Sequence, residues 1–185
     1  MNLELISYPK YKKNIKELYL CSFPKNERFP FWILKECSKE DKSNLYAVLD
    51  NDTFIGMCFI VDCDDANYLM YLAVEPQFRN KKYGSKILLD LKEKYKTLFL
   101  SIEFPIDNIG IRRRNFYLNN GFYNTNKIYE DTGVCYQVLC TNKDYKITNE
   151  NMKKRYTNMS NKPNLLKEIS NIFNTYKINL KEIKS

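Results

Sequence analysis

One stretch, residues 71–94, limits what this chain can fold into more than any other. It begins with an apolar run that ends at Pro76, which is the pattern of a buried strand. It ends with apolar residues at helical spacing, at Ile87, Leu88 and Leu91. A short basic turn separates the two parts. The stretch therefore predicts a strand that leads through a tight turn into an amphipathic helix.

The turn reads Arg79-Asn80-Lys81-Lys82-Tyr83-Gly84-Ser85. A turn at a helix N-terminus presents unpaired backbone N–H groups where the helix dipole is positive, and three cationic side chains add full charges here. These features suit a pyrophosphate group. The alternative interpretation is an ordinary solvated helix cap, which needs no ligand.

The pattern Val74-x-Pro76-x-x-Arg79-x-x-x-Tyr83-Gly84-x-x-Ile87-Leu88 resembles the acetyl-CoA signature of the Gcn5-related N-acetyltransferase (GNAT) family. The family core has the form Arg/Gln-x-x-Gly-x-Gly/Ala, and Lys82 stands where the first glycine usually lies. The resemblance implies that acetyl-CoA contacts the turn, namely Arg79, Asn80, Lys81, Lys82, Tyr83, Gly84 and Ser85. It also implies that backbone N–H groups of Leu72, Ala73 and Val74, on a strand that splays from its neighbour, hold the thioester carbonyl.

A second motif lies at residues 111–122 and ends in Phe-Tyr-x-x-x-Gly-Phe. Gly121 has the place of a left-handed helix terminator. The ending resembles the fourth helix of the same family, which implies that Tyr117 faces the CoA sulfur. Gly110 and Arg113 share a helix face with Tyr117, at positions where the family commonly has Asn and a small residue. Arg113 is therefore a candidate phosphate contact, and the alternative role for Tyr117 is packing.

Around these motifs the patterns predict the order β-α-α-β-β-β-α-β-α-β-β over residues 3–140, which agrees with the GNAT fold. We expect an α/β (α+β) protein with a mixed, mostly antiparallel central sheet of about seven strands, flanked by about four helices. The expected strands are 3–8, 44–49, 54–61, 68–74, 97–103, 127–130 and 134–140. The expected helices are 11–23, 31–37, 82–94 and the one ending at Gly121.

The loop of residues 23–30 is bounded by prolines and rich in aromatics. In the resembled fold, the first two helices and their connection flank the acceptor site. Glu27, Arg28 and Phe29 are therefore candidate acceptor contacts. The alternative is a loop that its aromatic side chains simply anchor.

The available side chains favour direct transfer over an acyl-enzyme. The chain has no histidine, and no cysteine lies in a recognisable nucleophile setting. Glu103, at the end of a predicted strand, is the first choice for the general base that deprotonates an amine, acting through water. Glu75 is the second choice, and either carboxylate could instead be a solvated strand end. Tyr117 is the candidate general acid for the departing thiolate.

Cysteine content and hydropathy argue against a metal-binding protein and a membrane protein. The six cysteines show no C-x-x-C spacing, so we expect free thiols and no metal site. No run approaches the roughly 18 apolar residues that a membrane span needs, and the N-terminus lacks a signal-peptide pattern. We therefore expect a cytoplasmic protein with no membrane partner.

The last 45 residues are more basic than the rest of the chain. Residues 141–185 carry +6 of the formal net charge of +8. We expect a catalytic domain at 1–140 and a basic extension at 141–185. Within the extension, residues 164–178 predict an amphipathic helix that docks on the body or forms a homodimer.

Two functions stay open at this stage. The first is acetyl transfer to a primary amine, whose acceptor could be a small amine, an antibiotic, a peptide N-terminus or a protein lysine. The second is a non-catalytic CoA-binding or nucleic-acid-associated module that uses the basic tail, although nucleic acid is disfavoured because the body carries only +2.

Overall fold

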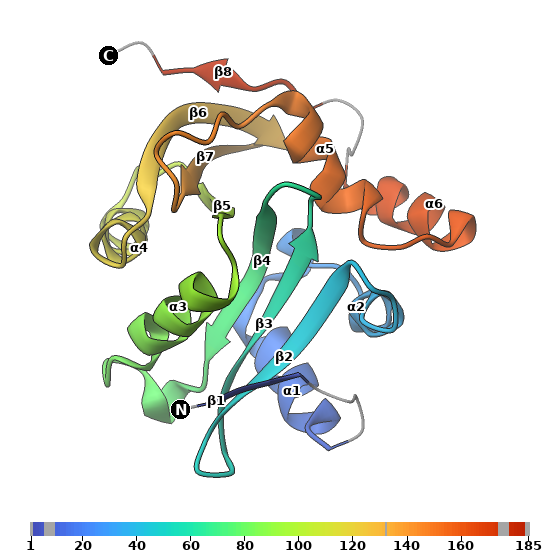
Figure 1. The fold of residues 1–185 in the computed structure, drawn as a ribbon, viewed down its shortest axis with the longest axis vertical. Helices are drawn as coiled ribbons and strands as arrows, with labels where there is room; N and C mark the ends of the chain where they lie inside the picture. The colour runs from blue at the N-terminus through green and yellow to red at the C-terminus, as the bar shows by residue number, and fades with distance from the viewer. Residues whose placement is uncertain (1, 6–9, 132, 174–177, 184–185) are drawn as a thin grey trace.

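The computed structural model describes residues 2–5, 10–131, 133–173 and 178–183, and it is built around a single sheet (Figure 1). The sheet has eight strands in the order β1-β2-β3-β4-β5-β7-β6-β8. All neighbours pair antiparallel except β4 and β5. The strands are β1 (Asn2–Leu5), β2 (Ser43–Asp50), β3 (Thr53–Asp62), β4 (Asn67–Val74), β5 (Leu98–Glu103), β6 (Tyr123–Asp131), β7 (Val134–Cys140) and β8 (Lys181–Glu182).

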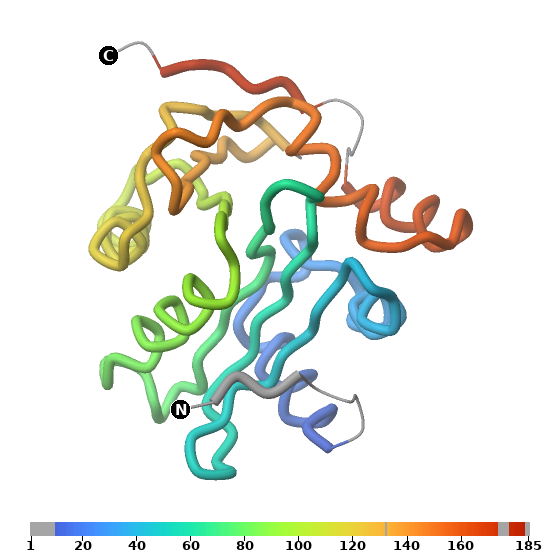
Figure 2. The backbone as a smooth tube through the Cα atoms, viewed as in Figure 1, coloured from blue at the N-terminus to red at the C-terminus, as the bar shows by residue number. Residues whose placement is uncertain are grey.

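Helices cover both faces of the sheet. They are α1 (Lys12–Ser22), α2 (Phe31–Cys37), α3 (Tyr83–Lys94), α4 (Asn108–Asn119), α5 (Asn149–Thr157) and α6 (Pro163–Ile172), with the short 3-10 turns η1 (Lys25–Glu27) and η2 (Pro76–Phe78). The tube in Figure 2 shows α3 and α4 on one side of the central strands and α1, α2 and the tail helices on the other.

The core is divided by the sheet because strand side chains alternate between its faces. In β2, Leu45 and Ala47 pack with α1 and α2, whereas Tyr46 and Val48 pack with α3. Both faces are covered, so the central strands are apolar throughout. This explains why β2 and β3 have apolar runs and no apolar–polar alternation.

The parallel strands β4 and β5 separate soon after they meet. Their pairing consists of Asn67 with Leu98 and Tyr68 with Phe99, at the N-terminal end of each strand. On its other side β4 stays paired with β3, and a register shift falls between Phe59 and Ile60. The remainder of the two strands therefore leaves a gap in the middle of the sheet, which is where the candidate site lies.

The predicted fold class is confirmed: the sheet is mixed and mostly antiparallel, and four helices flank it within residues 1–140. The eighth strand comes from the tail, because Ile128 and Lys127 of β6 pair with β8. Of the predicted first strand at 3–8, residues 3–5 are observed within β1, and residues 6–8 lie outside the described part. The observed α4 begins at Asn108, three residues before the motif noted in the sequence.

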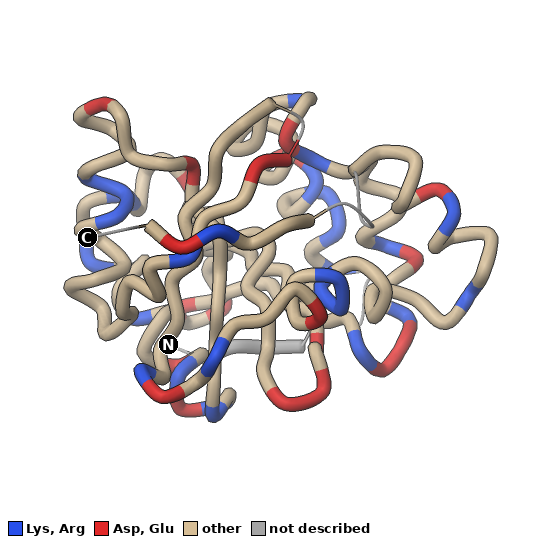
Figure 3. The backbone as a smooth tube through the Cα atoms, turned by 90° about the horizontal axis from the view of Figure 1, so that it is seen from above, with Lys and Arg blue, Asp and Glu red and all other residues tan. Residues whose placement is uncertain are grey.

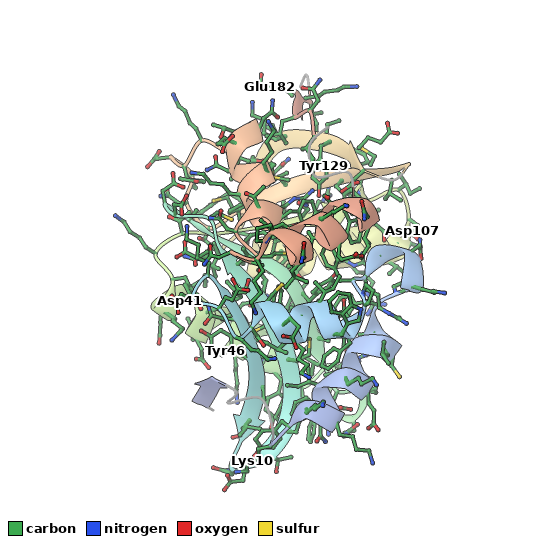
Figure 4. The ribbon with its side chains drawn as sticks, turned by 90° about the vertical axis from the view of Figure 1, so that its right-hand side faces the viewer. Lys10, Asp41, Tyr46, Asp107, Tyr129 and Glu182 are labelled. Atoms are coloured by element: carbon green, nitrogen blue, oxygen red, sulfur yellow. The ribbon has the colours of Figure 1, made fainter. Side chains whose placement is uncertain are left out.

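The C-terminal segment belongs to the body. Met152 and Tyr156 of α5, together with Leu165 and Ile169 of α6, are buried in the same core as α1 and α2. Figure 4 shows the two tail helices lying beside α2 against the same side of the sheet. The predicted helix at 164–178 was too long. Helix α6 ends at Ile172, and the next residue, Phe173, has an extended backbone. Residues 174–177 lie outside the described part, and α5 was not predicted.

Candidate functional site

The gap between β4 and β5 opens a cavity of about 550 Å³. Residues 68–74 of β4 and 100–103 of β5 form its two edges. Arg113, Phe116 and Tyr117 of α4 line it from one face of the sheet. The opposite half is lined by Glu27, Phe29, Tyr136 and Arg155, among others. The cavity thus passes through the sheet, and two reactants could approach each other from its two faces.

The basic turn lies at one end of this gap. Arg79 lines the cavity, and its Nε donates a hydrogen bond of 3.0 Å to the backbone oxygen of Val74. Lys82 has φ +63° and Asn80 has φ +60°, both in the left-handed region that favours glycine. The backbone of Lys82 thus adopts the glycine-like conformation although the side chain is present. Because that side chain is exposed, the turn keeps its shape with lysine at this position.

Helix α3 starts directly after this turn. A hydrogen bond of 3.1 Å runs from the Lys86 N–H to the Lys82 oxygen, four residues earlier, as in a regular α-helix. The preceding N–H groups at 83–85, which include those of Gly84 and Ser85, are the donors that a helix start leaves without helical acceptors. Together with the cations of Arg79 and Lys82 they form a positively polarised surface, of which Arg79 is the residue that lines the cavity.

Two predicted contacts of the turn direct their side chains elsewhere. The Tyr83 hydroxyl donates a hydrogen bond of 2.8 Å to Asp50 Oδ2, and the Lys81 ammonium lies 5.7 Å from the centroid of the Phe78 ring. Neither residue lines the cavity. In this structure both side chains contact neighbours of the turn outside the cavity.

The backbone of β4 has donors that face the gap. Glu75 N–H donates to the Ile55 oxygen of β3 at 2.8 Å. Since backbone groups alternate in direction along a strand, those of Ala73 also face β3, whereas those of Leu72 and Val74 face the gap. Of the three residues predicted to hold a carbonyl, two therefore present their N–H groups to the cavity.

Tyr117 reaches the gap from α4. Its ring lies between Phe116 and Phe122, with centroids 5.1 and 5.5 Å away. Burial raises the pKa of its hydroxyl to about 12, and the nearby Arg113 charge opposes this shift. Among the described residues the hydroxyl has no hydrogen-bond partner. It is therefore a neutral donor at neutral pH with its proton available to a ligand.

Two carboxylates meet on the other side of the gap. Glu103, at the end of β5, has Oε1 3.8 Å from Nη1 of Arg113. The pKa of Glu27 is raised, first by burial and then by the neighbouring Glu103 carboxylate. Arg113 is thus paired with Glu103, and its contact with a phosphate stays a prediction. Glu75 does not line the cavity; it precedes η2 at the end of β4.

Two of the three residues predicted as acceptor contacts lie at the cavity, and the third does not. Glu27 and Phe29 line the cavity, and the Phe29 N–H donates to the Tyr71 hydroxyl at 3.2 Å. Arg28 turns back to α1, where its Nη1 donates to the oxygens of Leu20 and Phe23. Arg28 therefore caps the C-terminus of α1, and the structure does not bring it to the other candidates.

Several cavity residues were not predicted. They include Tyr68, Tyr129, Asp131, Tyr136, Arg155, Tyr156 and Phe173. Tyr136 and Tyr129 stand in a row with Glu103 across β5, β7 and β6, so the aromatic residues of the terminal hairpin were a usable signal. Arg155 and Tyr156 come from α5, and no motif in the sequence marks them.

Three further features bear on the class of protein: metal-binding clusters, cysteines and membrane-spanning helices. The described part of the chain contains no cluster of three His, Cys, Asp or Glu side chains placed to hold a metal ion. All six cysteines are free. No helix of the described residues is long and apolar enough to cross a membrane.

Comparison with known proteins gives a consistent result. The family model described as an acetyltransferase (GNAT) domain matches residues 41–124. A solved structure described as a putative acetyltransferase of the GNAT family from Bacteroides thetaiotaomicron is 25% identical, with a TM-score of 0.71 over 81% of this chain and 90% of that chain. Comparison with curated proteins gives no significant match.

Two further solved structures show likeness of fold. An aminoglycoside 6'-N-acetyltransferase complexed with coenzyme A is 13% identical, with a TM-score of 0.64 over 80% of this chain and 100% of that one. An acetyltransferase from Bacillus subtilis, in complex with CoA, is 18% identical, with a TM-score of 0.57 over 75% of this chain and 96% of that one.

Proposed function

Because the chain belongs to the GNAT acetyltransferase family, we propose that it transfers the acetyl group of acetyl-CoA to a primary amine in the gap between β4 and β5. The observation that carries this proposal is the separation of these strands after two paired residues. It leaves the N–H groups of Leu72 and Val74 facing a cavity that also holds Tyr117 and Glu103.

The residues at the gap fit acetyl-CoA. The α3 start with Arg79 and Lys82 suits the pyrophosphate, because helix N-terminal N–H groups and cations bind phosphate oxygens. The gap-facing N–H groups of β4 would hold the thioester carbonyl and stabilise negative charge that develops on its oxygen. Acetyl-CoA supplies the activated acetyl group, and the other steps depend on the protein's own side chains.

Glu103 would accept a proton from the ammonium group of the acceptor, directly or through one water, so that the neutral amine can attack the thioester carbonyl. It lies at the end of β5 on the cavity surface, about half exposed. Glu27 adjoins it, and two neighbouring carboxylates attract a cationic amine. A primary amine is protonated at neutral pH, so a carboxylate at this point serves both to bind the acceptor and to accept its proton. Glu75 is less suited because it does not line the cavity.

Tyr117 would donate its proton to the departing thiolate. A free thiol has a pKa near 8.5, whereas the Tyr117 pKa is raised to about 12. The hydroxyl is therefore protonated when the thiolate leaves, and it stabilises the thiolate first as a hydrogen-bond donor. A partly buried hydroxyl without a hydrogen-bond partner among the described residues, on a ring packed by Phe116 and Phe122, is positioned for this role.

The tail argues against the rival function of a nucleic-acid module. Lys154 pairs with Asp64 at 3.0 Å, and Lys162 lies 3.7 Å from Glu40. Figure 3 shows basic and acidic segments intermixed around the molecule. A nucleic-acid arm needs cations clustered on one surface, and these two tail cations are instead paired with the body.

The test is the release of free thiol from acetyl-CoA in the presence of a panel of amines, with the product identified by mass. We expect at least one amine to be acetylated and the rate to fall at least about tenfold in Glu103→Gln. The control is Glu75→Gln, which should keep the rate. Failure of every amine, or full activity of Glu103→Gln, would contradict the proposal.

A further inference from the structure

The far end of the acceptor half of the cavity is built by the C-terminal segment. Arg155 and Tyr156 of α5 and Phe173 after α6 line it. All three lie outside residues 41–124, the part matched by the family model. The rings of Phe29, Tyr156 and Phe173 pack on one another, with Phe29 and Phe173 centroids 4.6 Å apart and Tyr156 stacked on Phe173. The tail thus closes this end with an aromatic wall around one cation.

That cation is the guanidinium of Arg155, which is only 2% exposed. Its Nη1 donates hydrogen bonds to the hydroxyls of Tyr129, at 2.7 Å, and Tyr68, at 3.0 Å. Its Nε donates to the Met152 oxygen at 3.1 Å. Nη2 lies 3.6 Å from Asp131 Oδ2. Among the described residues, however, Nη2 has no hydrogen-bond acceptor although it is buried.

The direction of these hydrogen bonds decides what this end can bind. A guanidinium has donors only, so the Tyr68 and Tyr129 hydroxyls accept from Arg155. The proton of each hydroxyl must then point to another acceptor. For Tyr68, no such acceptor exists among the described residues. A buried donor without a partner is costly. The Tyr68 proton and Arg155 Nη2 are therefore donors without a hydrogen-bond acceptor, since the neighbouring Asp131 carboxylate lies 3.6 Å from Nη2 and makes no hydrogen bond to it.

The charges along the cavity also discriminate between acceptor classes. Glu103 faces Arg113 at 3.8 Å, and Asp131 faces Arg155 at 3.6 Å. Of the cavity carboxylates on this side, only Glu27 is left as an excess negative charge. A pocket for a polycation would carry several. This pocket instead has its carboxylate pair near the reacting end and its hydrogen-bond donors at the far end.

We propose that the acceptor is a small amine that also carries a carboxylate, and that the Tyr68, Tyr129 and Arg155 cluster binds this carboxylate while the amine lies at Glu103 and Glu27. The proposal rests on the proposed function of the gap. The backbones of Glu103 and Tyr129 are two strands apart, about 10 Å, and their side chains point into the same cavity. An amino acid, with an aliphatic or aromatic body between its two charges, matches this arrangement.

The first test compares acceptors in matched pairs by acetyl-CoA-dependent thiol release. L-phenylalanine is set against phenethylamine, and 4-(aminomethyl)benzoate against 4-(aminomethyl)benzamide. We expect the carboxylate member of at least one pair to have a kcat/KM that is roughly 10- to 100-fold higher, the range for one or two charge-assisted hydrogen bonds. Uncharged members that are used equally well or better in both pairs would overturn this proposal and leave the acetyltransferase function intact. Turnover of no member at all, when other amines react, would also overturn it.

The second test assigns the preference to the cluster. Tyr68→Phe keeps the ring and removes the hydroxyl. It should therefore lower the ratio of kcat/KM values within a pair at least about threefold, by raising the KM of the carboxylate member. The KM of acetyl-CoA should stay unchanged. Arg155→Met combined with Asp131→Asn removes both charges together, which avoids leaving one buried charge unpaired, and should abolish the preference.

The matched control is Lys154→Met, one residue away on α5 and paired with Asp64 outside the cavity. It should keep the wild-type preference. A preference that survives in both Tyr68→Phe and the double variant, with folding verified by an unchanged circular dichroism spectrum, would overturn the assignment. If the double variant does not fold, Tyr68→Phe alone decides the result.

Discussion

Gly84 of α3 lies against Phe116 of α4: a Cβ placed on the glycine would be 3.0 Å from the Cζ atom of the Phe116 ring. The first turn of α3 and the middle of α4 are therefore in direct contact. Phe116 packs in turn on Tyr117, with centroids 5.1 Å apart. This contact fixes the distance between the basic turn and the candidate acid. It also gives Gly84 a packing role in addition to any contact with a phosphate.

Lys82→Gly should raise the free energy of unfolding by about 0.5–1 kcal/mol. The lysine has φ +63°, and a non-glycine residue in the left-handed region costs energy that glycine does not. The melting temperature should rise by roughly 1–4 °C in a chain of this size. The KM of acetyl-CoA should rise by no more than about fivefold, since one exposed charge is worth at most about 1 kcal/mol. A lower melting temperature would contradict the assigned backbone conformation.

Tyr117→Phe should lower kcat about a hundredfold or more while the KM of acetyl-CoA changes little. The substitution removes the proton donor and keeps the ring that packs on Phe122. Tyr83→Phe is the matched control, because it removes the hydrogen bond to Asp50 outside the cavity and should keep kcat. Equal turnover of Tyr117→Phe and wild type would assign Tyr117 to packing alone.

Glu27→Gln should raise the melting temperature at pH 7 to 8 and have little effect near pH 4. The pKa of Glu27 in the folded protein is raised above its ordinary value of 4.5, so above this pH the unfolded chain binds fewer protons than the folded one. Stability of the wild type therefore falls as the pH rises through the raised pKa. Glutamine removes the ionisation and its repulsion with Glu103. Glu17→Gln, at an exposed position of α1, is the control and should change the free energy of unfolding by less than about 0.5 kcal/mol.

Ile169→Ala should lower the free energy of unfolding by about 2–4 kcal/mol, the range for removing a large buried aliphatic side chain. Ile169 of α6 is 1% exposed and packs in the core shared with α1 and α2. Lys167→Ala, on the exposed face of the same helix, is the control and should cost less than about 0.5 kcal/mol. If Ile169→Ala were as stable as wild type, the tail would not be part of the folded body.

The elements that sequence patterns predicted well are those with local signals. The helix after the basic turn was expected at 82–94 and is observed at Tyr83–Lys94, because the left-handed Lys82 ends the turn one residue later. Gly121 ends α4 with φ +84°, as its place before Phe122 predicted. The start of α4 was missed although Asp107 is a good N-cap, accepting from the Gly110 N–H.

The residues that sequence reasoning missed depend on distant contacts. Arg155 joins Tyr68, which is 87 residues away, and Tyr129, which is 26 residues away, so no local pattern marks it. Arg28 was assigned to the acceptor site because of its neighbours, but the oxygens at the end of α1 are closer partners for its guanidinium. In the tail the apolar pattern continues past Ile172 because Phe173 and Ile178 are buried without belonging to the helix.

The most direct test of the account is the melting temperature measured with and without acetyl-CoA. A ligand that binds only the folded state at a concentration 100 times its Kd adds about 2.7 kcal/mol to the free energy of unfolding. We therefore predict that saturating acetyl-CoA raises the melting temperature of the wild type by several degrees. The rise should be smaller in Arg79→Ala, which removes the cation between the turn and Val74. A melting curve of the wild type that saturating acetyl-CoA leaves unmoved would contradict the assignment of the gap and the basic turn.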